Sequence, residues 1–213
     1  REPFVEIVHA DGSTTSDFRY ESYEITEKTA ETENGDLPGA YDERGEAQRL
    51  CIRLRDHSYD LVLELHYDVY AECDAIVRSA VLFNESKEMI RLNRLMSTQI
   101  DFDPAEYVFT TFTGAWAREM RRSDTRMEAG KHVNASYTGT SSSRANPFVM
   151  IAKTDTTEDT GECYGCNLIY SGNHYEAAEV SGYGKMRLTA GINPQSFSWL
   201  LAPWENFAAP EAV

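Results

Sequence analysis

Cys163 and Cys166 have the C-x-x-C spacing that proteins use to bind zinc or to carry out redox chemistry. A tetrahedral zinc site needs further ligands, and the sequence offers no second C-x-x-C and only five scattered histidines. The segment also has the composition of a strand, in which residues three positions apart point to opposite faces. We therefore predict unpaired, metal-free cysteines, and neither a metal nor another cofactor is expected.

Asp101 and Asp103 would lie on one face of a predicted strand, as a general acid and its partner do in some enzymes. Two carboxylates that cleave a bond between them must flank it from separate elements, which neighbouring residues of one strand rarely do. Turn chemistry before Pro104 explains Asp103 without catalysis. The sequence also lacks a glycine-rich phosphate loop, a G-x-S-x-G turn and an H-E-x-x-H helix. No catalytic set is predicted.

Trp116 lies in Thr113-Gly-Ala-Trp-Ala-Arg-Glu119, between the end of a predicted strand and an arginine-rich stretch. A tryptophan in such a place, beside Gly114, can expose an indole face on which the apolar C–H face of a sugar ring packs. The alternative is a core position, because tryptophan is usually highly buried. Trp199 alternates with apolar neighbours and is interpreted as a core residue.

The composition is that of a compact globular chain. Its 213 residues, 41% hydrophobic and 26% charged, suffice for one sizeable core, so a single domain over residues 1–213 is expected. The net charge of −15 repels nucleic acids and anionic lipids. No apolar stretch approaches the ~20 residues of a membrane-spanning helix, and the first residues contain no signal-peptide core. Four irregularly spaced cysteines favour a reducing compartment, so we expect a cytoplasmic protein without nucleic-acid or membrane partners.

The elements that would carry these residues are strands, because apolar and polar residues alternate through most of the chain. Residues 49–55 and 61–69 are predicted to form a hairpin around a turn at 56–59. Further strands are predicted at 75–83, 89–102, 107–113, 147–153, 163–170, 175–180, 185–192 and 197–201. The most helix-like segment, 115–126, has too few apolar residues to form a stripe. The pattern predicts an all-β fold, an antiparallel sandwich of two large sheets.

Short strings distributed along nearly the whole chain are Asp17-Phe-Arg-Tyr20, Leu37-Pro-Gly-Ala-Tyr41, Arg78-Ser79, Gly114-Ala-Trp-Ala-Arg-Glu119, Asn146-Pro-Phe148, Tyr170-Ser-Gly-Asn173 and Gly191-Ile-Asn-Pro194. In this order they resemble the N-terminal domain of the family 36 glycoside hydrolases, the microbial α-galactosidases. Collinear matching of this kind is far more specific than any single motif.

The resemblance implies a β-supersandwich that leads into a (β/α)8 barrel, in an enzyme that hydrolyses terminal α-1,6-linked galactose with retention, as in melibiose or raffinose. In that family the catalytic aspartates belong to the barrel, which would follow Val213, so residues 1–213 are expected to be non-catalytic. The chain is expected to begin inside the N-terminal domain, after the segment in which the family carries a sugar-contacting aspartate. Trp116 matches a substrate-contacting position. The implied partners are an α-galactoside, the barrel and further copies of the chain, since relatives form tetramers.

The sequence departs from the family in one loop. Tyr137-Thr-Gly-Thr-Ser-Ser-Ser143 replaces a stretch in which family members have two arginines and a histidine, so the polar contacts of that loop are expected to differ. Two functions remain open. The chain is either the non-catalytic part of an α-galactosidase, which assists substrate binding and assembly, or a free-standing carbohydrate-binding or structural β-sandwich. The start at Arg1 and the stop at Val213 favour the first.

Overall fold

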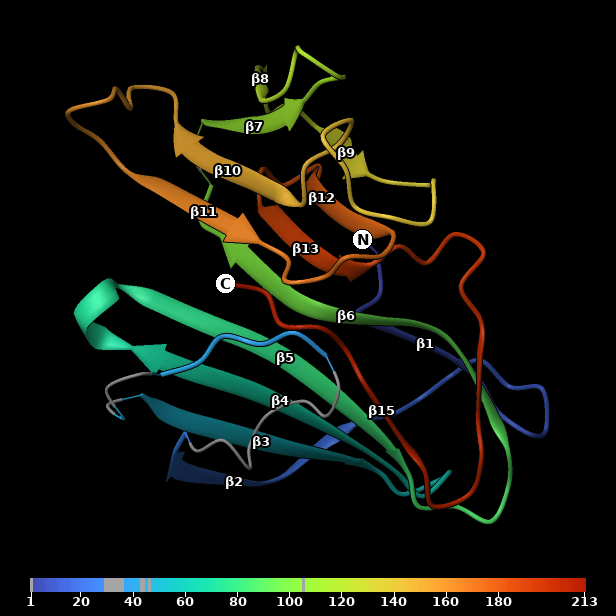
Figure 1. Cartoon of the computed structure of the whole chain (residues 1–213). Coiled ribbons are helices and arrows are strands. Elements are labelled where there is room, and N and C mark those ends of the chain that lie inside the picture. The colour runs from blue at the N-terminus through green and yellow to red at the C-terminus, as the bar shows by residue number, and fades with distance from the viewer. Residues whose placement is uncertain (1, 29–36, 43–44, 46, 105) are drawn as a thin grey trace.

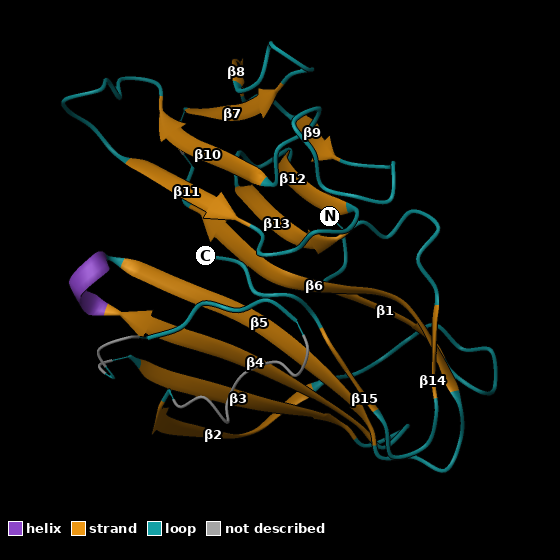
Figure 2. Ribbon diagram, viewed as in Figure 1, coloured by secondary structure: helices purple, strands orange, loops and turns teal. Residues whose placement is uncertain are grey.

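The computed structural model describes residues 2–28, 37–42, 45, 47–104 and 106–213, so Arg1, the first residue of the expected domain, lies outside the description. The described residues form antiparallel strands and a short 3₁₀ turn, η2 (Ala71–Cys73) (Figure 1, Figure 2). The strands are β1 (Val5–Val8), β2 (Arg19–Glu27), β3 (Gln48–Asp56), β4 (Leu61–Tyr70), β5 (Ala75–Asn84), β6 (Ile90–Phe102), β7 (Tyr107–Thr113), β8 (Arg121–Arg126), β9 (Gly130–Ala135), β10 (Phe148–Lys153), β11 (Cys163–Asn167), β12 (His174–Val180), β13 (Met186–Ile192), β14 (Trp199–Leu201) and β15 (Asn206–Ala208). Within these ranges, no helix is long and apolar enough to cross a bilayer.

The described strands pair in three antiparallel sheets. One sheet of six strands has the order β1-β6-β13-β12-β9, with β14 also paired to β6. A five-stranded sheet has the order β15-β5-β4-β3-β2, and a four-stranded sheet the order β11-β10-β7-β8. Figure 1 shows the five-stranded sheet below and the four-stranded sheet above it. The predicted all-β, antiparallel fold is confirmed.

The last residues of the chain, 209–213, join the four-stranded and five-stranded sheets. Ala212 exchanges backbone hydrogen bonds of 2.7 and 2.8 Å with Arg78 of β5. Val213 exchanges two of 2.9 Å with Asn167 of β11. The tail therefore acts as a strand between β5 and β11 (Figure 1). Through the tail, the two smaller sheets form one continuous layer, and this layer lies opposite the six-stranded sheet. The arrangement is the expected two-layer sandwich.

Two apolar cores fill the space between the layers. The first core lies between the five-stranded sheet and strands β1, β6 and β14, and includes Leu63, Leu82 and Leu92. The second core lies between the four-stranded sheet and strands β12 and β13, and includes Phe109 and Leu188. Because β6 contributes to the first core and packs its last residue against the second, this 13-residue strand connects them. Burial of both cores fixes the relative position of the sheets.

The alternation in the sequence predicted the inner strands better than the edges. The hairpin is observed as β3 and β4, and β7 has the bounds that were predicted. Strands β1, β2, β8, β9 and β15 were not predicted. Every residue of β2 is exposed, and β8 is the charged sequence 121–126, so neither strand has a buried apolar face that the sequence could reveal. Both are edge strands held by backbone pairing to one neighbour.

The interpretation of Trp199 as a core residue was wrong. Its side chain is 49% exposed, and its indole packs 5.5 Å from the ring of Phe207 at the surface. The reason is that β14 has only three residues and pairs with β6 alone. The four cysteines are unpaired, as predicted.

A buried ionic cluster fastens the tail to the five-stranded sheet. Arg49 of β3 donates two hydrogen bonds to Asp68 of β4, of 2.5 and 2.7 Å. Lys28 Nζ lies 2.9 Å from Asp68 Oδ2 and 3.6 Å from Glu211 Oε1. These side chains are between 1 and 6% exposed, and two cations balance two carboxylates. Lys28 also donates to the carbonyl of Ala40, which brings segment 37–42 into the cluster.

Asp68→Asn is expected to destabilise the fold by about 3–5 kcal/mol, because it leaves Arg49 and Lys28 buried with one carboxylate between them. Asp124→Asn on the exposed strand β8 is the control, with an expected cost below about 1 kcal/mol. Burial alone would raise the pKa of Asp68, but hydrogen bonds from Arg49 and Lys28 outweigh it and lower the pKa. The contribution of Asp68 is therefore present above its unfolded pKa and lost as the pH falls through its folded pKa. Chemical denaturation of both variants at neutral and acidic pH measures these differences, and equal losses in the two variants would contradict the role of the cluster.

Candidate functional site

The loop between β7 and β8 carries Trp116 at its tip. Ala115 and Arg118 close the turn, since the N–H of Arg118 donates to the carbonyl of Ala115 at 2.8 Å and the N–H of Ala115 donates back at 3.3 Å. Trp116 and Ala117 occupy the two central positions, and Ala117 has a φ of +60°. Positive φ at the second central position is typical of a type II turn, which prefers glycine there. Ala117 therefore has a backbone conformation that costs free energy in a residue other than glycine.

Gly114 allows this loop to close tightly. A Cβ at this position would lie 2.8 Å from the Cα of Glu119, closer than packed atoms allow, and nearer still to the carbonyl oxygen of Arg118. The carboxylate of Glu119 accepts a hydrogen bond of 2.9 Å from the N–H of Ala117 and holds the turn from the other side. The loop geometry therefore depends on glycine at 114 and on an acceptor at 119.

Trp116 is 91% exposed. The core alternative for this residue was therefore wrong, because the hairpin tip extends past both cores. Arg118, Arg121 and Arg144 are also exposed. An open indole can pack on the apolar C–H face of a sugar. Its role in substrate binding remains a prediction.

A second loop, residues 137–146, is joined to the first through Asn146. The N–H of Asn146 donates to the carbonyl of Phe112 at 3.0 Å, and its side-chain amide reaches the sulfur of Met120 at 3.3 Å. The rings of Phe112 and Phe148 stack with centroids 5.6 Å apart, which packs the two strand ends together. The loop at residues 137–146 therefore adjoins the base of the hairpin that carries Trp116.

A fully buried pair, His174 and Glu176 of β12, holds the second loop in place. Nδ1 of His174 lies 2.8 Å from Oε2 of Glu176, and its Nε2 donates to the carbonyl of Ala145 at 2.8 Å. Asn134 donates to the same carboxylate oxygen at 2.9 Å and to the carbonyl of Asn146 at 2.7 Å. Both side chains of the pair are 0% exposed. Burial would lower the pKa of His174, but the hydrogen bond and charge of Glu176 outweigh it and raise the pKa.

Sequence reasoning missed this pair, although a signal was present. His174 and Glu176 are two residues apart in a strand, so both point to one face, and that face belongs to a strand flanked on both sides by others. A charged pair on the inner face of a central strand is costly unless its members neutralise each other. We interpret the pair as a positioning device, because its hydrogen bonds end on the backbone of the loop and on Asn134.

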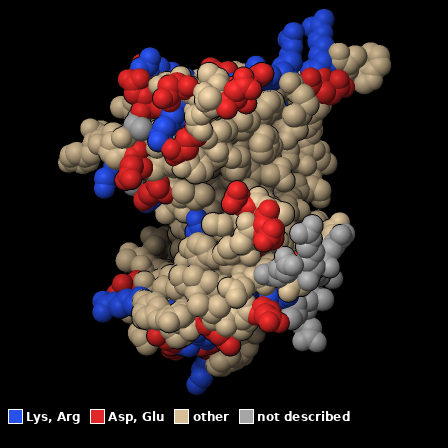
Figure 3. Space-filling view, turned by 90° about the vertical axis from the view of Figure 1, so that its left-hand side faces the viewer, with Lys and Arg blue, Asp and Glu red and all other residues tan. Residues whose placement is uncertain are grey.

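The structure separates the acidic residues considered for catalysis from this site. Both oxygens of Asp101 accept hydrogen bonds from Arg187, at 2.6 and 2.7 Å. Asp101 and Asp103 line a pocket of about 760 Å³ between β5, β6 and β11, on the side of the molecule that Figure 3 shows to be hollowed. The pocket walls are mainly apolar and aromatic, with Ile76, Phe102 and Tyr164 among them. The ion pair with Arg187 thus occupies Asp101, the first of the two acids considered.

The C-x-x-C motif spans the two faces of β11, as predicted. Cys163 is exposed and Cys166 is buried. Burial raises the pKa of Cys166 to about 12, so this thiol stays protonated at neutral pH. A different cysteine, Cys51, has the side chains of Glu64 and His66 beside it, and these three offer donor atoms within 4.8 Å of one another. Among the described residues this is the one group of three that could hold a metal ion.

Comparisons with known proteins agree on one family. Residues 1–202 match the model described as the glycosyl hydrolase family 36 N-terminal domain. Probable alpha-galactosidase G of Emericella nidulans is 38% identical over the whole chain, and alpha-galactosidase AgaA of Geobacillus stearothermophilus is 37% identical over 214 aligned residues. The chain spans 29% of the length of each.

Solved structures give the same result. The crystal structure of an alpha-galactosidase from Lactobacillus brevis superimposes with a TM-score of 0.96 at 36% identity, covering 100% of this chain and 28% of that protein. An AgaA variant from G. stearothermophilus in complex with raffinose also gives a TM-score of 0.96, at 35% identity, with 100% of this chain and 29% of that protein covered.

Glu176→Gln is expected to destabilise the protein by about 3–5 kcal/mol, because the buried His174 loses its counter-charge. Hydrogen exchange should rise in residues 137–146 more than in the first core, since the pair holds that loop. Glu128→Gln, at an exposed position before β9, is the matched control and should change stability by less than about 0.5 kcal/mol. Mass-resolved hydrogen exchange and thermal melts measure both effects. Unchanged exchange in the loop would show that the pair does not position it.

Proposed function

The chain belongs to glycosyl hydrolase family 36 as its N-terminal domain, and from this premise we propose that it is the non-catalytic part of an α-galactosidase. The proposed reaction of the whole protein is hydrolysis of terminal α-1,6-linked galactose, as in melibiose or raffinose, with retention. Relatives support the substrate class, because structures of AgaA variants from G. stearothermophilus hold stachyose or raffinose. The catalytic aspartates are proposed to lie in a (β/α)8 barrel beyond residue 213.

The proposed contribution of the chain to the substrate pocket is Trp116. The observation that carries this proposal is the 91% exposure of its side chain at the tip of a strained turn. Exposing a large aromatic residue and accepting a positive φ at Ala117 both cost stability, and neither improves the packing of the domain. A binding role accounts for both costs, since stacking on a sugar ring needs an uncovered indole.

Two surfaces support the proposed contacts with the barrel and with further copies of the chain. The face of the five-stranded sheet that builds the first core extends beyond that core. This outlying part carries Tyr23 and Ile25 of β2 and Ile76 of β5, which are 63, 61 and 52% exposed. We assign this uncovered apolar face to the barrel. The free edge of β2 is exposed over nine residues and is the surface we assign to a second copy, because an edge strand offers unpaired backbone groups.

The proposal includes neither a cofactor nor a nucleic-acid or membrane partner for the galactosidase reaction. The net charge of −15 supports the last two points, because phosphate-bearing partners are bound through lysine and arginine. The unpaired state of all four cysteines supports a cytoplasmic location.

The purified chain by itself is expected to hydrolyse no α-galactoside, because the proposed nucleophile and acid lie in the barrel. Incubation with a nitrophenyl α-galactoside, compared with buffer and with the complete enzyme, measures this. Turnover that survives repurification would contradict the proposal. Tight binding of free galactosides by the chain alone would instead favour the free-standing carbohydrate-binding module.

Trp116→Ala in the complete enzyme is expected to lower kcat/KM by about 5- to 150-fold, equivalent to about 1–3 kcal/mol of lost binding, with the melting temperature unchanged. The reason is that the indole packs on substrate and on little of its own domain. Tyr183→Ala is the control, since Tyr183 is 93% exposed in the turn before β13. A Trp116→Ala enzyme that melts much lower but keeps its kcat/KM would assign Trp116 to packing.

A further inference from the structure

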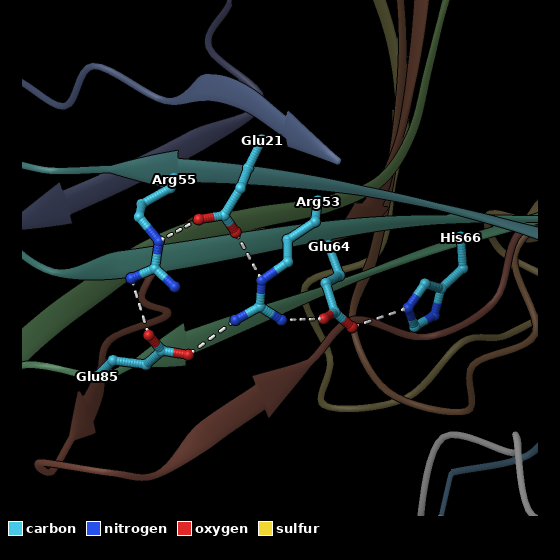
Figure 4. Close-up of polar contacts among 6 residues, drawn as sticks. All are labelled: Glu21, Arg53, Arg55, Glu64, His66 and Glu85. Carbon is cyan, nitrogen blue, oxygen red and sulfur yellow. Dashed lines mark hydrogen bonds and ion pairs between the residues drawn. The ribbon is translucent and has the colours of Figure 1, made fainter. Parts of the chain in front are cut away.

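The outer face of the five-stranded sheet, opposite the first core, carries a network of charged side chains (Figure 4). Arg53 donates to Glu21, Glu64 and Glu85 at 2.9, 2.7 and 2.8 Å, and Arg55 donates to Glu21 and Glu85 at 2.7 and 2.8 Å. At the end of this network, Nε2 of His66 lies 3.3 Å from Oε2 of Glu64. Galactoside hydrolysis, as proposed above, uses none of these residues.

This network has an excess of negative charge. Three carboxylates, those of Glu21, Glu64 and Glu85, share two guanidinium groups, so one carboxylate charge is left without a cation when His66 is neutral. We place this excess negative charge at Glu64. Its Oε1 accepts a hydrogen bond from Arg53, and its Oε2 faces His66. The side chains of Glu64 and His66 are only 18 and 12% exposed, so water screens this charge poorly.

The strand register brings a third donor to the same point. Cys51 of β3 lies directly opposite His66 of β4, and Glu64 is two residues before His66 on the same face. The sulfur, a ring nitrogen and a carboxylate oxygen all lie within 4.8 Å of one another. Two ligands of a tetrahedral zinc ion, at ~2.1 Å from the metal, are about 3.4 Å apart. The 3.3 Å between Nε2 and Oε2 fits that separation and is long for a direct hydrogen bond.

We propose that Cys51, Glu64 and His66 form a binding site for a divalent zinc-like ion on the outer face of the five-stranded sheet. The cysteine binds as the thiolate and releases its proton to solvent. The carboxylate of Glu64 binds through Oε2 and keeps its hydrogen bond from Arg53 on Oε1, as ligating carboxylates commonly do. Sulfur, imidazole and carboxylate together favour Zn²⁺ over Mg²⁺ or Ca²⁺, which prefer oxygen ligands. This proposal revises the expectation of metal-free cysteines for Cys51.

The fourth position is open to water or to Glu24, which lies opposite Cys51 on β2. Nδ1 of His66 is buried and has no hydrogen-bond partner among the described residues. A zinc site whose histidine lacks a hydrogen bond on its other ring nitrogen binds its metal about 10- to 100-fold more weakly than a site that has it. The site is therefore a modest structural clamp across β3 and β4, and it is separate from the loop that carries Trp116.

Titration of the reduced, metal-free protein with Co²⁺ tests the site, because a cobalt-bound thiolate gives a charge-transfer band in the near ultraviolet. We expect the band to saturate at one equivalent and to disappear on addition of Zn²⁺. Cys51→Ser should abolish it and His66→Gln should weaken binding at least tenfold. Zinc at 100 times its Kd should raise the melting temperature of the unmodified protein by about 5–11 °C.

Cys73→Ser and Cys163→Ser are the matched controls, since both thiols are exposed and lie outside the cluster, and both variants should keep the band. Circular dichroism of each metal-free variant shows whether it is folded. If Cys51→Ser does not fold, the cobalt affinity of His66→Gln tests the site instead. A band that survives in Cys51→Ser but vanishes in Cys163→Ser would overturn the proposal. So would an unmodified protein that shows neither the band nor a shift in melting temperature with zinc.

Discussion

The architecture depends on a buried carboxylate, Glu211, in the strand-like tail that joins two sheets. Its backbone lies between β5 and β11, and its side chain enters the cluster of Lys28, Arg49 and Asp68. A charge in this position is tolerated only while its partners stay in place, because an isolated buried ion costs several kcal/mol. The same contacts that neutralise Glu211 therefore hold the tail, the end of β2 and segment 37–42 on the five-stranded sheet.

A second group of buried, oppositely charged side chains lies in the six-stranded sheet. His174 and Glu176 neutralise each other inside the six-stranded sheet and bind the backbone of the loop at residues 137–146. That loop contacts the base of the β7–β8 hairpin through Asn146. A chain of polar contacts thus connects a central strand with the base of the hairpin that carries Trp116. Buried charged groups thus position segments 37–42 and 137–146, whereas the two apolar cores set the positions of the sheets.

Exposed apolar side chains gather at two kinds of place in this domain. The most uncovered aromatic side chains stand at hairpin tips, and a second apolar region on β2 and β5 extends past the first core. Large apolar surfaces of this kind mark sites of contact. The outer face of the five-stranded sheet is different, because charged side chains cover it and leave one negative charge beside Cys51 and His66.

Local patterns in the sequence were enough to predict the all-β class, the β3–β4 hairpin, the bounds of β7 and, through collinear strings, the family. Alternation of apolar and polar residues is a local property, so it can be recognised without knowing which strands pair with each other. It could not reveal β8, whose six charged or polar residues are ordered by backbone pairing to β7. The exposure of Trp116, the burial of His174 and the pairing of Cys51 with His66 became apparent only once the strands were assembled. Alternation assigns a residue to a face, but the register and the packing of distant segments decide what covers that face and which side chains meet on it.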